Sequence, residues 1–507
     1  MTELQSLTDN NKRIAKNTAY LYIRMAVVMV VSLYTSRKVL ETLGVSDYGV
    51  YDVMGGVIGM LGYANTLLAG GISRFLTIAL GEGNMQNLKK LFSTTLSMTM
   101  LSAFVVLALG ESIGLWFVYT NLNIPTGRMV AAIWVYQCAL ISSCLTIIQS
   151  PFTASVISHE KMSIYAYMSI WDSAVKLLIV YLLIISGYDK LIVYGSLLLL
   201  SNFLNVVIYR LYCLKKFEEC TNRLGFNVEI FKKILGYNSW NMIGGFAGVL
   251  TNYGVNIIVN IFFGTTVNAA RGIATQVSAI VQNLFSNFQM AANPQIYKYY
   301  AQQNLNEMYN LVINTSKYCT YLLLCIVVPI CVNVTGLLGI WLHEVPPFTA
   351  LFVQLSMIYI LVCSIDAPVG ISIHAVGRMK TPNLSTALVN LCVFPLSWMA
   401  FKFGGAPHYG YLFMILSVVL CLTIDLYIVK LYIEFPVWMF VKKCFSPIII
   451  ISLCSTCISM IVRYCIPVSQ IWGVLASTTL SVGLVTTFIF LVGLPRGIRK
   501  MIVSKII

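Results

Sequence analysis

The stretch Asn11–Val31, NKRIAKNTAYLYIRMAVVMVV, passes from polar to apolar within a few residues. Lys12, Arg13 and Lys16 precede a long apolar run, which is the pattern of a membrane-spanning helix that begins on its cationic side. Arg24 lies inside the run, roughly 12 Å beyond Lys16 at the helical rise per residue. A guanidinium at that depth costs at least a few kcal/mol unless it faces water, a counter-charge or a ligand. Arg24 is therefore a candidate functional residue.

The composition places the whole chain in a membrane. Of its 507 residues, 58% are hydrophobic and only 10% are charged, whereas soluble proteins carry roughly 25% charged residues. Long apolar runs recur between short polar breaks, without the alternation of a membrane β-barrel. The sequence predicts an all-α polytopic membrane protein with about fourteen transmembrane helices, at 17–36, 48–70, 92–118, 129–150, 163–186, 190–213, 237–262, 267–290, 312–341, 348–372, 383–403, 409–432, 444–465 and 470–494.

The net charge of +15 follows from the membrane topology. If the N-terminus is cytoplasmic, most Lys and Arg residues between the spans fall on the cytoplasmic side, as the positive-inside rule requires. We therefore expect both termini in the cytoplasm, and no nucleic-acid partner is needed to explain the charge. Four cations remain within spans, namely Arg24, Lys176, Arg271 and Lys317.

The longest polar connection divides the spans into two groups. It predicts an N-lobe (1–213), an amphipathic cytoplasmic linker (214–236), a C-lobe (237–432), and two additional helices with a cytoplasmic tail (433–507). A shift of 220 residues lays the second group over the first without gaps for about 55 residues, with Gly44 on Gly264 and Asn84 on Asn304. Both copies begin from the cytoplasm, so we expect parallel repeats, seen as two pseudo-symmetric lobes around a central cavity.

Polar residues follow one face of several spans. Interhelical hydrogen bonding and close packing are one explanation, but the number of polar positions along 267–290 favours a hydrated cavity. The predicted cavity-lining residues share helical spacing within each span. They are Asn17 and Tyr20 in the first span, Asn241, Asn252 and Asn256 in the seventh, and Asn268, Thr275, Ser278, Gln282 and Gln289 in the eighth.

Three cations are candidates for binding a pyrophosphate. Arg24 and Arg271 have no acid three or four residues away, and a guanidinium can bind phosphate oxygens in pairs. An acid on another helix would instead make each of them part of a structural ion pair. Lys176 follows Asp172 by one helical turn, so a local ion pair is the first interpretation and substrate contact the second.

Other chemistry has little support in the sequence. Asp366 and Asp425 are candidates for coupling transport to protons or ions. The four histidines are dispersed, and the single C-x-x-C motif lies within a predicted span, so we expect no metal site. No phosphate-binding loop or nucleophile–base group is visible, so we expect neither catalytic residues nor a cofactor.

The stretch Tyr34–Gly56, YTSRKVLETLGVSDYGVYDVMGG, resembles the connection between the first two spans of Wzx-type oligosaccharide flippases. Arg37, Leu43–Gly44 and Asp47–Gly49 occupy the places of that family's arginine, leucine-glycine and acidic-Tyr-Gly residues. The segment Gly377–Leu384, GRMKTPNL, also resembles the family's inner Gly-Arg loop. These flippases belong to the multidrug/oligosaccharidyl-lipid/polysaccharide exporter superfamily.

The resemblance implies a substrate and a mechanism. The implied substrate is an undecaprenyl-diphosphate-linked oligosaccharide, moved by alternating access to the outer leaflet of the bacterial inner membrane. It would serve cell-surface polysaccharide such as lipopolysaccharide O-antigen, with a polymerase and glycosyltransferases as candidate partners beside the lipid bilayer. A lipid II flippase or a multidrug and toxin extruder is the alternative. A membrane glycosyltransferase or polymerase is disfavoured, because the outer connections are too short for a catalytic domain.

Overall fold

The computed structural model describes the backbone of residues 2–159, 161–221, 223–466, 471–495, 497 and 499. Within these ranges it leaves undescribed the side chains of 2–26, 64–71, 74, 162, 237–243, 287–288, 290–291 and 294. Four predicted site residues fall among these side chains, namely Arg24, Asn17, Tyr20 and Asn241. The predictions made for these four side chains therefore concern positions outside the described residues.

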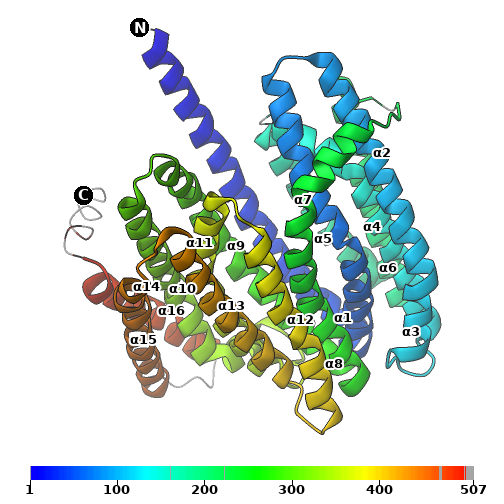
Figure 1. Ribbon diagram of the computed structural model, residues 1–507. Coiled ribbons are helices and arrows are strands. Elements are labelled where there is room, and N and C mark those ends of the chain that lie inside the picture. The colour runs from blue at the N-terminus through cyan, green and yellow to red at the C-terminus, as the bar shows by residue number, and fades with distance from the viewer. Residues whose placement is uncertain are drawn as a thin grey trace. The chain divides into compact units, whose positions relative to one another are not determined.

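The described backbone is helical, without a strand. Figure 1 labels the α-helices, and short π-helical turns, written η, interrupt several of them. The elements are α1 (Thr2–Gly81), α2 (Met85–Leu109), η1 (Gly110–Gly114), α3 (Leu115–Asn121), α4 (Met129–Ser158), α5 (Met162–Ile185), α6 (Lys190–Lys216), α7 (Val228–Val249), η2 (Leu250–Gly254), α8 (Val255–Phe263), α9 (Thr265–Ala301), α10 (Leu305–Trp341), α11 (Thr349–Val376), α12 (Lys380–Lys402), α13 (Tyr409–Ile433), α14 (Val437–Phe440), η3 (Val441–Phe445), α15 (Ser446–Cys465), α16 (Ile471–Phe488) and η4 (Ile489–Gly493).

The helices correspond to the predicted membrane spans. Among the described residues, eleven helices are long and apolar enough to cross a membrane. The predicted spans 17–36, 48–70 and 267–290 fall on the two parts of α1 and on α9. The all-α multi-pass architecture is therefore confirmed. Several helices extend beyond their apolar runs; α10, for example, begins at Leu305 rather than near residue 312.

Helix α1 is two helices joined at Gly44. This residue has φ 77° and ψ 165°, a backbone conformation that essentially only glycine adopts. The chain reverses direction there, and the two parts of α1 diverge from this turn (Figure 1). The Leu-Gly pair of the resembling motif therefore marks the turn between the first two spans.

The chain divides into two compact units, unit 1 (Met1–Ala269) and unit 2 (Ala270–Ile507). The unit boundary lies within α9. In the linker predicted at 214–236, α6 ends at Lys216 and α7 begins at Val228, both inside unit 1. The predicted division into an N-lobe, a linker, a C-lobe and two additional helices stays a prediction.

Unit 1 is built around α1 and α4. Two apolar clusters fill it, one around Met54, Tyr136 and Leu140, the other around Phe92 and Phe152. The second part of α1 also packs closely on η2 and α8. A Cβ added at Gly49 would lie 1.9 Å from the backbone oxygen of Thr265, and one at Gly59 would lie 2.7 Å from the Tyr253 ring. Glycine at these positions permits the close approach of the helices.

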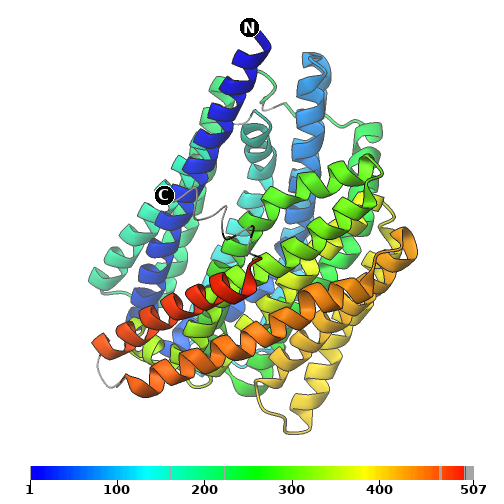
Figure 2. The ribbon, with the colours of Figure 1, turned by 90° about the vertical axis from the view of Figure 1, so that its left-hand side faces the viewer.

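Unit 2 is built around α10. This helix packs on α11, α15 and α16, and α13 packs on α11 and α12. Figure 2 shows α15 and α16 side by side along one edge of the unit. One apolar cluster, including Leu324, Val369 and Val429, runs through these helices.

Candidate functional site

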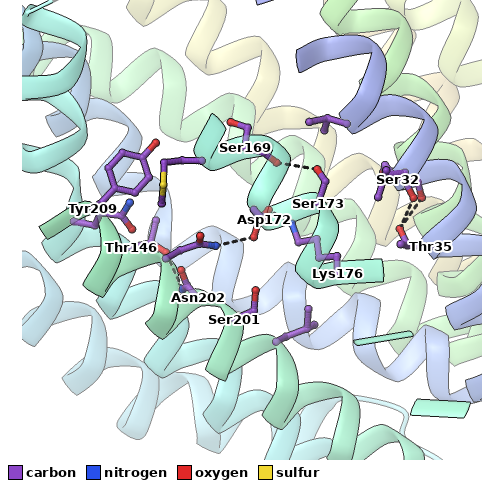
Figure 3. Close-up of a pocket in the computed structure, with 16 residues that line it drawn as sticks. Ser32, Thr35, Thr146, Ser169, Asp172, Ser173, Lys176, Ser201, Asn202 and Tyr209 are labelled. Atoms are coloured by element: carbon purple, nitrogen blue, oxygen red, sulfur yellow. Dashed lines mark hydrogen bonds and ion pairs between the residues drawn. The ribbon is translucent and has the colours of Figure 1, made fainter. Parts of the chain in front are cut away.

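A polar cavity of about 490 Å³ lies inside unit 1, between α1, α4, α5 and α6 (Figure 3). Its wall carries hydroxyl and amide groups from all four helices, with a few apolar side chains among them. The polar lining residues are Ser32 and Thr35 of α1, Thr146 and Gln149 of α4, Ser169, Asp172, Ser173 and Lys176 of α5, and Ser201, Asn202, Asn205 and Tyr209 of α6. Because these helices span the membrane, the cavity is a polar chamber within an apolar bundle.

The charged groups of the cavity are joined in one network. Lys176 Nζ lies 2.7 Å from Asp172 Oδ2, which confirms the predicted local ion pair. Asn205 Nδ2 donates to the other carboxylate oxygen of Asp172 at 2.8 Å. The Lys176 side chain is 49% exposed. An ammonium has three N–H donors, so this ion pair leaves Lys176 able to contact a ligand.

Two buried polar atoms on α6 are unsatisfied. Among the described residues, Ser201 Oγ and Asn205 Oδ1 have no hydrogen-bond partner, and Ser201 is only 4% exposed. These residues lie one helical turn apart and both line the cavity. Between them, Asn202 Nδ2 is held by Ser142 O at 2.7 Å and Thr146 Oγ1 at 3.1 Å. An unsatisfied buried polar atom costs about 1–3 kcal/mol, so water or a ligand in the cavity would be stabilised here.

A second cavity of about 600 Å³ adjoins the first. The two share Thr146, Lys176, Leu198 and Asn202 as lining residues. The second cavity is more aromatic: Tyr51 and Tyr63 line it from α1 together with Gly55, Gly59 and Gly62 of the same helix, and Tyr253 lines it from η2. Lys176 therefore stands at the border between a polar chamber and an aromatic one.

Two of the predicted cavity-lining residues are bonded between helices. Asn268 is fully buried and donates to the backbone and side-chain oxygens of Asn256, at 2.9 and 3.0 Å. Asn256 in turn donates to Asp52 Oδ2 of α1 at 2.9 Å. Neither asparagine lines the two cavities of unit 1. In the described structure, this network ties α8 and the start of α9 to α1.

Arg271 is buried in unit 2. It is 4% exposed, its guanidinium carbon lies 4.8 Å from the centre of the Tyr411 ring, and Nη2 lies 3.6 Å from Met414 Sδ. Along the same helix, Thr275 is exposed, and Ser278, Gln282 and Gln289 are half-buried. Asn252, in unit 1, is exposed and donates to Gly248 O. The roles predicted for these residues stay predictions.

Asp366 and Asp425 come together inside unit 2, although they lie on different helices, α11 and α13. Their carboxylates are close enough to interact electrostatically. Among the described residues, Oδ1 of each is buried without a hydrogen-bond partner, and Asp425 is 8% exposed. Cys363 and Cys421 lie beside them. The two buried carboxyl groups, Asp366 and Asp425, form a pair that is able to take up a proton or a cation.

The polar residues of α4 and α6 in the first cavity are absent from the predicted site. A signal for α5 exists in the sequence, because Ser169, Asp172, Ser173 and Lys176 recur at three- and four-residue steps. On α6, Ser201, Asn202 and Asn205 form a shorter polar group in an otherwise apolar span. Neither pattern indicates by itself that these two faces meet α1 and α4.

Comparison with known proteins identifies the fold. No protein-family model and no curated protein sequence matches the chain. Among solved structures, the chain is similar to the lipid II flippase MurJ in an inward-closed conformation, with a TM-score of 0.69 and 13% identity over 94% of this chain and 98% of MurJ. This chain has the fold of MOP-superfamily transporters.

Two further structures with the MOP fold support this assignment. A multidrug-resistance MATE transporter in an inward-facing conformation has a TM-score of 0.62 and 11% identity, over 80% of this chain and 96% of its own. A MOP-superfamily transporter from Pyrococcus furiosus has a TM-score of 0.54 and 13% identity, over 81% and 94%. The MOP fold thus occurs in both a flippase and a multidrug transporter, and the site chemistry must distinguish between such functions.

Proposed function

We propose that this protein is a flippase for an undecaprenyl-diphosphate-linked oligosaccharide. It would move the lipid-linked sugar from the cytoplasmic to the outer leaflet of the bacterial inner membrane by alternating access, with both termini cytoplasmic. The product would serve cell-surface polysaccharide such as O-antigen, made together with a polymerase and glycosyltransferases. The observation that carries the proposal is a polar cavity with a half-exposed lysine inside a bundle of apolar helices.

In this proposal, cations hold the pyrophosphate and neutral polar groups hold the sugars. Arg24, Arg271 and Lys176 are the proposed pyrophosphate ligands, because cationic donors form strong hydrogen bonds with phosphate oxygens. The sugars would contact three polar faces as the headgroup moves. These are the faces of the first span (Asn17, Tyr20), the seventh (Asn241, Asn252, Asn256) and the eighth (Asn268, Thr275, Ser278, Gln282, Gln289). No bond is made or broken, so the protein would act as a transporter and not as an enzyme.

The acid pair of unit 2 offers a means of coupling transport to a gradient. Asp366 and Asp425 would take up a proton or a monovalent cation from one side and release it on the other. Binding would relieve the repulsion between the two carboxylates and so favour one conformation over another.

A multidrug extruder is the second candidate, favoured by the similarity to a MATE transporter. An extruder of cationic drugs would benefit from a free carboxylate in its cavity. In the polar cavity of unit 1, the Asp172 carboxylate is bonded to Lys176 and Asn205. This arrangement favours a ligand that is neutral or anionic.

The proposal is tested with the full chain reconstituted in liposomes. Undecaprenyl diphosphate carrying an N-acetylhexosamine disaccharide should become accessible to a membrane-impermeant sugar oxidant faster than in protein-free liposomes. Ethidium and lipid II, offered in parallel, test the extruder and the lipid II flippase. Transport of ethidium without transport of the disaccharide lipid would overturn the proposal.

A lysine variant tests the anion contact. Lys176→Met should slow flipping of the disaccharide lipid about tenfold, because a charge-assisted hydrogen bond contributes roughly 1.5–3 kcal/mol. Lys190→Met, at the exposed start of α6, is the matched control and should leave the rate unchanged.

A further inference from the structure

We propose that the polar cavity between α1, α4, α5 and α6 binds the sugar residues next to the diphosphate, with Ser201 and Asn205 as sugar ligands. The inference rests on the proposed function and adds a place and a set of residues for the glycan. Of the predicted site residues, Lys176 lines this cavity, and Thr35, on the polar face of the first span, lines it too.

The size of the cavity suits a short glycan. Its volume of about 490 Å³ lies within the range of small-molecule sites, roughly 300–1,000 Å³. It adjoins the second cavity at Lys176, which could contact the diphosphate while the first sugars enter the polar chamber. A single contiguous ligand would then span the border between the two cavities.

The chemistry of the wall suits neutral hydroxyl groups. The Asp172 carboxylate is neutralised by Lys176, so the wall does not attract a free cation strongly. Ser201 Oγ and Asn205 Oδ1 are buried and without partners among the described residues. A sugar hydroxyl can donate to Asn205 Oδ1 and accept from the Ser201 hydroxyl, because a hydroxyl has one donor and two lone pairs while an amide oxygen only accepts.

The apolar residues of the cavity wall suit the ring of a sugar. Val28, Val31, Met168 and Leu198 line the same cavity, and they offer surface to the C–H faces of a pyranose ring. A polyprenyl chain would fit this chamber poorly, because it would leave the buried serine, asparagine and threonine groups without hydrogen bonds. A sugar satisfies both kinds of surface.

The test compares two ligands that differ only in the sugar. Binding of undecaprenyl diphosphate and of undecaprenyl diphosphate carrying an N-acetylhexosamine disaccharide is measured on the purified full chain in nanodiscs. We compare the wild type with Ser201→Ala and with the double variant Ser201→Ala/Asn205→Ala. The matched control is Ser397→Ala on α12, because Ser397 is also a buried serine whose Oγ has no partner among the described residues, and it lines neither cavity.

We expect the wild type to bind the disaccharide lipid more tightly than the bare carrier. Ser201→Ala should weaken binding of the disaccharide lipid about fivefold, and the double variant more than tenfold, since each lost hydrogen bond contributes about 1 kcal/mol. Binding of the bare carrier should stay within twofold in both variants, which also shows that they are folded. Ser397→Ala should change neither affinity.

Two results would overturn the inference, and they differ in what they leave standing. Equal wild-type affinity for the two lipids, or variants that weaken both alike, would mean that the cavity holds only water while the flippase proposal survives. Failure of the wild type to bind either lipid would remove the proposed function and this inference together.

Discussion

Arg128, which directly precedes α4, forms ion pairs with Asp47 of α1 and with Asp189, which directly precedes α6. Its Nε donates to Asp47 Oδ1 at 2.8 Å and its Nη1 to Asp189 Oδ2 at 2.6 Å, while Nη2 contacts both carboxylates. Asp189 also caps α6 by accepting from Leu191 N and Ile192 N. The acidic residue of the resembling motif, Asp47, is thus a structural partner of Arg128.

Arg128→Met should lower the free energy of unfolding by about 1–2 kcal/mol, because partly exposed charge pairs contribute less than buried ones. Hydrogen bonding to Arg128, together with backbone N–H groups, lowers the pKa of Asp189 below its ordinary value of 3.8. A lowered carboxyl pKa stabilises the fold above the ordinary value, and the stabilisation is lost as the pH falls through the lowered pKa. The difference between variant and wild type should therefore shrink below about pH 4.

The measurement is thermal unfolding in detergent at neutral and acid pH. Lys190→Met removes a neighbouring exposed cation and should leave the unfolding temperature nearly unchanged. A variant as stable as the wild type at neutral pH would show that Arg128 contributes nothing to folding.

A second prediction concerns the effect of a substitution at Gly44 on stability. At φ 77° and ψ 165°, alanine would be strained although nothing lies within 4 Å of the added Cβ. Gly44→Ala should destabilise the protein by about 1–3 kcal/mol through the backbone alone. Gly55→Ala, on the same element with equally open space and no positive φ, should be neutral or slightly stabilising. Comparison of the two unfolding temperatures tests the argument, and equal values would refute it.

At the scale of elements, the contact of α1 with η2, α8 and the start of α9 depends on glycine at positions 49 and 59. Ser46 Oγ of α1 lies 3.4 Å from Thr265 Oγ1. With the Asp52–Asn256–Asn268 network, this pair places polar groups at two levels of the contact. Such a contact is specific, because each buried polar group needs its partner.

Gly49→Ala tests this packing. The added Cβ would lie 1.9 Å from Thr265 O, and a backbone oxygen cannot move aside without shifting α9. We expect a loss of about 1–3 kcal/mol in unfolding free energy, as for other overpacked contacts. The result is measured by chemical or thermal unfolding against the Gly55→Ala control, and an unchanged midpoint would show that the contact is loose.

At the scale of the whole molecule, the 220-residue repeat is visible in the backbone. Gly44 and Gly264 share one rare conformation, with φ 77° and 78° and ψ 165° and −174°. Asn84 and Asn304 both cap the helix that follows, accepting from Asn87 N and Glu307 N. The side chains that carry charge do not repeat: the described Asp172–Lys176 pair belongs to unit 1, and the Asp366–Asp425 pair to unit 2.

This asymmetry predicts separable effects on transport. If unit 2 couples flipping to a gradient, Asp366→Asn with Asp425→Asn should reduce the stimulation of flipping by an imposed proton or sodium gradient to near the rate without a gradient. Glu344→Gln, an exposed acid between α10 and α11, is the control and should keep the stimulation. The measurement is flipping in liposomes with and without each gradient, and full stimulation in the double variant would exclude the acid pair as the coupling site.

The sequence alone determined those features that depend on local spacing. Apolar run length predicted the helices, and the 220-residue shift placed Gly44 on Gly264 and Asn84 on Asn304. One-turn spacing predicted the Asp172–Lys176 pair, because neighbours on one helix face meet wherever the helix lies. Only the tertiary structure decided which helix faces enclose the polar cavity, why Asn256 and Asn268 bond each other, and that Asp366 lies within electrostatic range of Asp425. These interactions join residues far apart in the chain. Their partners depend on how the helices pack, and the periodicity of a single helix does not predict that packing.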